Sequence, residues 1–173
     1  FTLIYLYFNK KKKKILFEKG DIFWSYDYPV ITKSRPIKRV QTNIILLLNF
    51  TRHWENVYNL LNNKINDIPF LKKKPFAIWR GTTTGQPNRF GNRFNLVKKW
   101  YKKCKEINVG FSFIHREYLK DEYKKYSIGK SSPNEILKYK YIISSEGNDI
   151  SSGLKWYLFS NSIVLMPKPT IVS

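Results

Sequence analysis

A run of glycines, hydroxyl groups, acids and amides near the end of the chain has the composition of a phosphate-binding turn. The run is Ser145-Glu146-Gly147-Asn148-Asp149-Ile150-Ser151-Ser152-Gly153. It follows the apolar segment 139–144, which predicts a strand, and precedes 154–159, which favours a helix. A helix that begins within residues 151–153 presents free N–H groups and the positive end of its dipole, which suit a diphosphate. The same pattern fits a plain turn at Gly147 and an ordinary N-cap at Ser151.

A second polar junction, Trp79-Arg80-Gly81-Thr82-Thr83-Thr84-Gly85, follows the predicted strand 76–79. An arginine can donate to two oxygens of a phosphate at once, and glycines allow the backbone to approach a ligand closely. We therefore expect Arg80 to contact a ligand, the alternative being a surface arginine at a strand end. A third junction carries His115, and a lone histidine there is more often a surface or core residue than a catalyst.

The elements that must position these junctions alternate between strand and helix from residue 76 onward. Helices are predicted at 92–106 and 116–126, a capping box at Ser132-Pro133-Asn134-Glu135, and strands at 76–79, 109–114, 142–143 and 162–166, the last of them buried. This alternation predicts the α/β class, with a Rossmann-like parallel sheet and helices on both faces. Ligands of such sheets bind at the carboxyl ends of the strands, where the junctions lie.

The chain before this alternation is less regular. The basic run Lys10 to Lys14 is expected on a solvated loop, with short strands at 22–24 and 29–32. An apolar run at 44–48 precedes helical spacing over 54–65. We divide the chain into a partial N-terminal or linking region, 1–70, and a Rossmann-like domain, 71–173, and expect the natural protein to continue at both ends.

The charge of the chain suggests a polyanion as a partner. The 173 residues include 32 Lys+Arg and 12 Asp+Glu, a formal net charge of +20. A non-enzymatic basic module for RNA or anionic polysaccharide is therefore an alternative function. We favour it less, because lysine outnumbers arginine and accompanies abundant Asn, Ile, Tyr and Phe, as AT-rich coding sequence produces. No specific nucleic-acid partner is predicted, whereas peripheral contact with an anionic membrane surface is compatible with the charge.

Cysteine and segment length bear on the compartment. The single cysteine, Cys104, excludes an internal disulfide and predicts a reducing, cytoplasmic location. Residues 1–8 are apolar but too few to span a bilayer, so we interpret them as a strand and place the protein in the cytoplasm, with the membrane surface as a further possibility. The oligomeric state stays open.

The order and spacing of several motifs resemble the glycosyltransferases of family 90, which modify lipopolysaccharide and are associated with capsules. The resemblance covers roughly residues 29–167. The motifs are Lys33-Ser34-Arg35-Pro36, Arg52-His53-Trp54, Trp79 to Gly85, Arg93-Phe94-Asn95-Leu96-Val97, Glu146 to Asp149, Leu154-Lys155-Trp156 and Ser162 to Pro167.

The resemblance implies the C-terminal, donor-binding half of a GT-B glycosyltransferase, holding a UDP-sugar. Many family members carry an arginine near the position of Gly153 or Leu154, and this chain does not. Either Lys155 supplies that charge, or Arg80 and Arg93 suffice. The donor-binding residues implied or suggested by the junctions are Lys33, Ser34, Arg35, Arg80, Gly81, Thr82, Thr83, Arg93, Glu146, Gly147, Asn148, Asp149, Ser151, Ser152 and Lys155.

The implied reaction is an inverting transfer of a glucose- or xylose-like sugar to a glycan or protein hydroxyl, in capsule, lipopolysaccharide or glycoprotein synthesis. No metal and no cofactor besides the UDP-sugar substrate are expected, because fixed cations can stabilise the departing UDP and no Asp-x-Asp pair is present. The family's general base lies upstream of Lys33, so the catalytic residue is unknown and this chain alone is expected to be inactive. Weak candidates are Glu18, Asp21 and Asp27. Another Rossmann-type nucleotide enzyme is less favoured, because neither G-x-G-x-x-G nor a Walker lysine is present.

Overall fold

A computed structural model describes residues 2–8, 11–18, 20–22, 24–37, 42–45, 50–88, 90–115 and 119–172. The chain forms two compact units. The first comprises residues 1–48, 148–150 and 168–173, and the second comprises 49–147 and 151–167. Within the described ranges, no helix combines the length and apolar character that crossing a membrane requires.

The second unit is built on a four-stranded sheet in which every described pairing is parallel. Its strands are β6 (Lys74–Thr82), β7 (Ile107–Phe113), β8 (Tyr139–Ile143) and β9 (Ile163–Leu165). Their order is β7-β6-β8-β9, with Trp79 of β6 opposite Val109 and Ile78 opposite Ile142. The chain therefore adds β7 on one side of β6 and then returns to add β8 on the other, as in doubly wound α/β sheets.

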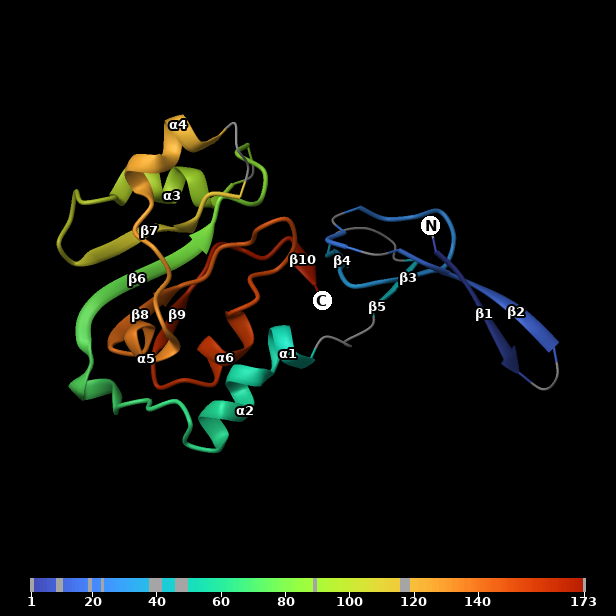
Figure 1. Cartoon of the computed structure of the whole chain (residues 1–173), viewed down its shortest axis with the longest axis horizontal. Helices are drawn as coiled ribbons and strands as arrows, with labels where there is room; N and C mark the ends of the chain where they lie inside the picture. The colour runs from blue at the N-terminus through green and yellow to red at the C-terminus, as the bar shows by residue number, and fades with distance from the viewer. Residues whose placement is uncertain are drawn as a thin grey trace. The chain divides into compact units, whose positions relative to one another are not determined.

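Helices cover both faces of this sheet, as Figure 1 shows. On one face, α3 (Arg93–Trp100) and α4 (Lys120–Tyr123) pack over Trp79, Val109 and Phe111. On the other face, α2 (Glu55–Leu61), α5 (Pro133–Ile136) and α6 (Leu154–Leu158) pack over Ile78 and Ile142. Ile78 and Trp79 of β6 pack into the cores on opposite faces of the sheet, because successive side chains of a strand alternate between the two faces. The predicted α/β class, with a parallel sheet and helices on both faces, is confirmed.

Capping residues set where two of these helices begin. Asn92 caps α3 by accepting a hydrogen bond from the Asn95 amide at 2.8 Å. Ser132 and Glu135 form the predicted capping box on α5, with Pro133 in the first turn. The helix predicted over 92–106 ends earlier, at Trp100, and Lys102 has a positive φ of 55°. The chain must turn there to enter β7, so Cys104 lies in a turn and not on a helix.

Three further expectations for this unit are corrected. The helix predicted to begin at Ser151 and Ser152 is the five-residue α6, whose N-cap is Gly153, and no side-chain hydrogen bond caps it. β9 is not a buried strand, because it is an edge strand with Ile163 and Leu165 exposed. The charged helix predicted over 116–126 is present as α4 and a 3-10 turn, η3 (Lys124–Tyr126), while residues 116–118 lie outside the described residues.

The helical spacing predicted over 54–65 also ends early. A short helix, α1 (Phe50–His53), precedes α2, which stops at Leu61. The turn η1 (Phe70–Lys72) then leads into β6. Ile65 is buried although it lies beyond the helix, because the loop folds back onto the core that contains Val57.

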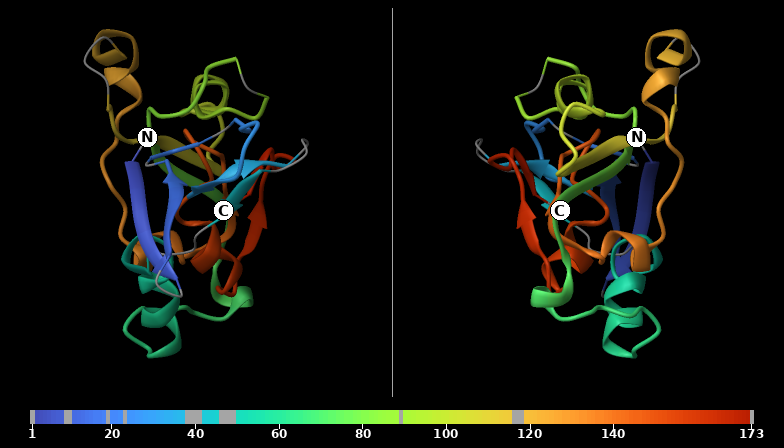
Figure 2. Two further views of the ribbon diagram at one scale, coloured as in Figure 1. Left: turned by 90° about the vertical axis from the view of Figure 1, so that its right-hand side faces the viewer. Right: turned by 90° about the vertical axis from the view of Figure 1, so that its left-hand side faces the viewer.

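The first unit holds a mixed sheet of order β1-β2-β3-β5. Its strands are β1 (Thr2–Phe8), β2 (Lys11–Phe17), β3 (Val30–Thr32) and β5 (Asn43–Ile45). The hairpin β1–β2 is antiparallel and is drawn in blue in Figure 2, while β3 pairs in parallel with β2 and β5. β4 (Arg35–Pro36) pairs with β10 (Ile171–Val172).

The hairpin corrects the expected solvated loop at the basic run. Lys11 to Lys14 lie in β2, and their backbones pair with residues 5–8 of β1. Lys10 lies outside the described residues, as do 46–48 of the apolar run. No strand forms at Ile22 or Trp24, where the backbone of Ile22 instead bonds the Ser34 hydroxyl. The strand expected at 29–32 is confirmed as β3.

Candidate functional site at the carboxyl edge of the parallel sheet

The change of direction in strand order places two loops side by side at the carboxyl ends of β6 and β8. Residues 83–85 follow β6, and residues 144–147 follow β8. Strands β6 and β8 are hydrogen-bonded neighbours, but the connection after β6 leads away to β7. Such a switch point is where open parallel sheets bind ligands, because no crossover covers the strand ends. The two glycine- and hydroxyl-containing junctions of the sequence therefore meet.

Arg93 bridges these two loops from the first residue of α3. Its Nε and Nη2 donate to the carbonyl oxygen of Ser145 at 3.3 and 3.1 Å. Its Nη1 donates to the Thr84 hydroxyl at 2.6 Å and to the Thr82 carbonyl at 3.3 Å. The guanidinium carbon also lies 6.0 Å from the ring centroid of Trp79, within cation–π range. A fixed positive charge is thus held at the switch point by four hydrogen bonds.

Glycines allow the loops to approach each other this closely. A Cβ atom on Gly147 would lie 2.9 Å from Arg93 Cζ and from Thr84 Oγ1. A Cβ on Gly85 would lie 2.9 Å from the carbonyl oxygen of Gly147, and Gly85 has a φ of +97°, which side-chain-bearing residues rarely adopt. Both positions therefore require glycine if Arg93 is to keep its place.

Hydroxyl groups surround the bridge. The Thr82 and Thr84 hydroxyls lie 3.1 Å apart. Ser145 donates its hydroxyl proton to the Gly91 carbonyl at 2.8 Å, which ties the β8 loop to the segment before α3. Thr83 is fully buried, and its hydroxyl accepts the backbone N–H of His115 at 2.8 Å. Thr83 therefore links the ends of β6 and β7 and has a structural role in this arrangement.

Tyr157 of α6 contributes a buried phenol near the same edge. Burial raises its pKa to about 12, and the nearby Arg93 charge opposes that rise. A Cβ on Gly153 would lie 2.5 Å from the Tyr157 hydroxyl oxygen, so Gly153 gives the ring its room. The phenol is therefore neutral at physiological pH.

Arg80 does not join this group, although the sequence predicts it as a ligand contact. Its side chain leaves β6 on the face opposite Trp79, and its guanidinium donates to the Trp79 carbonyl, to the Asn108 carbonyl and to Asn108 Oδ1 at 2.8, 3.0 and 2.8 Å. Asn108 in turn donates to the Tyr139 hydroxyl at 2.8 Å. Asn108 and Tyr139 lie at the amino ends of their strands, and burial lowers the pKa of Arg80. Arg80 thus braces the sheet away from the switch point.

Three predicted residues, Lys33, Ser34 and Arg35, form part of a polar cluster in the first unit. Lys33 pairs with Asp21 at 2.7 Å and with the buried Asp149 at 2.5 Å. Ser34 is fully buried and donates its hydroxyl proton to the Ile22 carbonyl. Arg35 donates to the Asn43 carbonyl at 3.2 Å. Of the three carboxylates considered as a base, Asp21 is therefore engaged by a lysine.

The other predicted residues are placed as follows. Gly81 lies near the end of β6, where its Cβ would meet the Trp79 ring at 2.6 Å. Lys155 lies on α6, with its ammonium 5.3 Å from the ring centroid of Trp54. Glu146, Asn148 and Ser151 are partly buried in the loop after β8, and Ser152 is exposed there.

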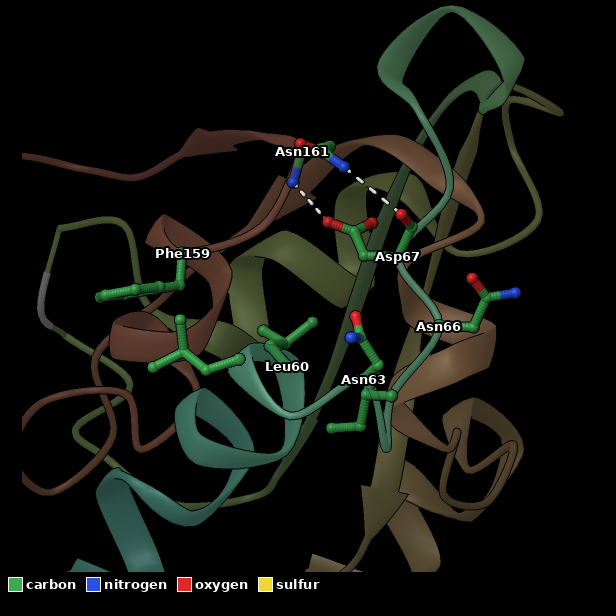
Figure 3. Close-up of a pocket in the computed structure, with 8 residues that line it drawn as sticks. Leu60, Asn63, Asn66, Asp67, Phe159 and Asn161 are labelled. Carbon is green, nitrogen blue, oxygen red and sulfur yellow. Dashed lines mark hydrogen bonds between the residues drawn. The ribbon is translucent and has the colours of Figure 1, made fainter.

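A pocket of about 390 Å³ opens elsewhere in the second unit, between the end of α2 and the turn after α6. The polar groups in its wall bond to each other. The Asp67 carboxylate accepts the backbone N–H of Asn161 at 2.5 Å, and the Asn161 side chain donates to the Asp67 carbonyl, as Figure 3 shows. Asp67 also pairs with the buried Lys73. The pocket therefore marks a structural junction, and the candidate site remains the carboxyl edge.

Sequence reasoning did not single out Ser145 and Thr84, although both contact Arg93. Each lies directly after a strand, and inspection of the first two residues after every strand would have found them. Ser145 contacts Arg93 through its backbone carbonyl oxygen, and Thr84 does so through its side-chain hydroxyl. A sequence pattern does not show which of these two groups a residue will use. Within the described ranges, no group of three or more His, Cys, Asp or Glu side chains gathers as a metal site would require.

These features define an α/β protein with a parallel sheet, helices on both of its faces, and an arginine held between two glycine-containing loops at the switch point. The chain belongs to Glycosyl transferase family 90, whose sequence profile matches residues 44–172. The resemblance seen in the sequence is thereby confirmed. The O-glucosyltransferase LpsA of Dichelobacter nodosus is 32% identical over 152 residues, which is 87% of this chain. The aligned region is 42% of that relative, so the chain spans less than half of its length.

Proposed function

We propose that the protein to which this chain belongs transfers a sugar from a UDP-sugar to a hydroxyl group of a glycan or protein. The chain would supply the C-terminal, donor-binding half of a GT-B glycosyltransferase. Family membership and the likeness to an O-glucosyltransferase support glycosyl transfer, and a glucose- or xylose-like sugar is the donor class we favour. The observation that carries the proposal is the Arg93 bridge at the switch point.

The geometry suits a nucleoside diphosphate for a physical reason. Arg93 places a positive charge at the end of β6 and β8, and Gly85 and Gly147 let the two loops pack closely around it. Negative charge develops on the diphosphate as the sugar leaves, and a preorganised cation stabilises that charge without reorganising. We infer that this fixed cation takes the place of a metal ion.

The acceptor hydroxyl must lose its proton during an inverting displacement, which calls for a general base. Asp21 and Asp149 are both engaged by Lys33, so we assign that role to a carboxylate in the part of the protein beyond this chain. The proposed setting is capsule, lipopolysaccharide or glycoprotein synthesis in the cytoplasm, with the protein touching an anionic membrane surface where a membrane-linked acceptor is reached.

A thermal-shift titration of the purified chain tests donor binding directly. We expect UDP and UDP-glucose to raise the unfolding temperature and uridine to do so far less, because the diphosphate provides the charge that Arg93 meets. Equal shifts for UDP and for any polyanion, abolished together by salt, would favour the basic binding module instead. On the full-length protein, transfer or hydrolysis of the UDP-sugar should persist in excess chelator, and strict dependence on added manganese would contradict metal independence.

A further inference from the structure

Lysines concentrate on one part of the second unit, away from the switch point. Nine lysines fall between residues 98 and 130, against four acidic residues. They extend from the last turn of α3, through the turn that enters β7, to η3. Six of these lysines are exposed and lie at the end of α3, in the turn after it and in η3, and we call them the lysine cluster: Lys99, Lys102, Lys103, Lys105, Lys124 and Lys125.

Aromatic rings hold the two segments of the lysine cluster together. Tyr101, after α3, meets Tyr126 of η3 in an edge-to-face contact with ring centroids 5.3 Å apart. Tyr126 also lies 6.1 Å from Tyr123, which is buried in the core. The two backbone segments that carry the lysines are thus held next to each other by packed rings before any partner arrives.

The lysine side chains lie along these rings. Lys102 lies 5.3 Å from the centroid of Tyr101, and Lys125 lies 5.1 Å from that of Tyr126. Lys99 is 5.1 Å from the centroid of Trp100. The ammonium group of each lysine therefore lies within cation–π range of a ring, so positive charge and aromatic surface are presented side by side, as they are at the headgroup level of a bilayer.

Little of this charge is neutralised within the protein. Among the described residues, one lysine of the cluster forms an ion pair: Lys105 lies 3.9 Å from Glu106, and both side chains are exposed. The stronger pair of Lys98 with Glu122, at 2.5 Å, lies at its border. Within the described ranges, most of the lysines in the cluster therefore have no ion pair and face the solvent.

We propose that the lysine cluster binds the surface of an anionic lipid bilayer. Headgroups with single negative charges match point-charge ammonium groups, and tyrosine and tryptophan rings settle at the headgroup level. A nucleic acid fits less well, because the cluster holds no arginine fork and because Lys102 and Lys125 lie over the rings of Tyr101 and Tyr126, on which bases would stack. This inference rests on the proposed function, in which the acceptor is reached at a membrane.

The fold makes such binding compatible with catalysis. The turn from Tyr101 to Glu106 enters β7 at the amino edge of the sheet, whereas Arg93 and the two loops lie at the carboxyl edge. A bilayer bound through the lysine cluster would therefore leave the switch point open to a soluble donor.

Vesicle co-sedimentation tests the proposal. The probes are phosphatidylcholine vesicles and vesicles in which phosphatidylglycerol replaces part of that lipid. The test variant is Lys102→Gln/Lys103→Gln/Lys105→Gln. The matched control, Lys64→Gln/Lys72→Gln/Lys138→Gln, removes the same charge from exposed lysines outside the cluster. We expect wild type and control to bind the anionic vesicles alone, and the test variant to partition on the order of 100-fold less, since each lysine near such a surface contributes about fivefold.

Any other pattern of vesicle binding overturns the proposal. Equal losses in both triple variants would mean that overall charge governs binding, and unchanged partition of the test variant would place the contact elsewhere. If the test variant loses binding to single-stranded RNA but keeps binding to vesicles, the lysine cluster is an RNA site. The UDP-induced thermal shift, measured on the same three proteins, should not differ among them. Its absence from all three, with selective vesicle binding intact, would sink the donor proposal alone.

Discussion

The guanidinium group of Arg93 binds the carbonyl oxygen of Ser145 through both Nε and Nη2, at 3.3 and 3.1 Å. This contact joins the start of α3 to the end of β8, two segments 52 residues apart in sequence. In this orientation the remaining donor group of the arginine, Nη1, reaches the Thr84 hydroxyl and the Thr82 carbonyl. The charge at the switch point is therefore built by the fold and not by a ligand.

Replacing Arg93 with glutamine should abolish the UDP-induced thermal shift. The change removes the positive charge that would meet the diphosphate. It also removes the guanidinium group that holds the loops after β6 and β8 together. It should also lower the free energy of unfolding by about 1–3 kcal/mol, because the Ser145 and Thr82 carbonyls lose a charged donor. Calorimetric titration with UDP and denaturant unfolding measure the two effects.

The matched control for that variant is Lys138→Gln, which removes one exposed charge before β8. It should leave UDP binding as in the wild type. A UDP affinity equally reduced in both variants would mean that net charge, and not the Arg93 geometry, attracts the nucleotide.

Gly147→Ala tests the close approach of the two loops. The new methyl group would lie 2.9 Å from Arg93 Cζ and Thr84 Oγ1, so the arginine must move. We expect weaker UDP binding with the overall fold retained, measured by calorimetry and circular dichroism. The control Gly129→Asn adds a side chain where no atom lies within 4 Å and where asparagine tolerates the positive φ. Normal UDP affinity in Gly147→Ala would show that the bridge does not form part of the donor site.

The parallel sheet, and the meeting of polar loops at its carboxyl edge, could be predicted from sequence because they depend on local patterns. Apolar segments at regular intervals predicted β6, β7 and β8, and the polar residues after the strands predicted that the loops would meet at this edge. The capping box at Ser132 followed from four adjacent residues. In each case the signal lies within a few positions of the element it determines.

The direction of individual side chains could not be predicted in this way. Arg80 and Arg93 are both arginines near a strand end, but strand alternation sends Arg80 to the face of Asn108, while the first turn of α3 aims Arg93 at Ser145. Likewise, the lysines of β2 form a strand because β1 pairs with them, which no property of the basic run indicates. These outcomes depend on partners distant in sequence.

Lys73→Met should destabilise the second unit strongly. The Lys73 side chain is fully buried, pairs with Asp67 and donates to the Leu137 carbonyl at 2.5 Å. Methionine fills a similar volume but leaves the partly buried Asp67 without its cation, and loss of one partner costs about 3 kcal/mol in a buried pair. The exposed neighbour provides the control, since Lys72→Met should change the free energy of unfolding by less than about 0.5 kcal/mol. A small effect at Lys73 in denaturant unfolding would mean that water or a rearranged loop replaces the ion pair.

Glu135→Gln should reduce stability at neutral pH but not in acid. The hydrogen bonds that Glu135 accepts from the Ser132 backbone and hydroxyl lower the pKa of its carboxyl group. A carboxyl group with a lowered pKa in the folded state stabilises that state above its unfolded pKa, and this contribution disappears as the pH falls through the folded value. Glutamine preserves the shape of the capping box without the charge. The unfolding temperature of the variant should therefore lie below that of the wild type at pH 7, and the two should converge below about pH 4, near the ordinary pKa of a glutamate. A difference that stays constant across this range would show that the charge of Glu135 does not contribute to holding the start of α5.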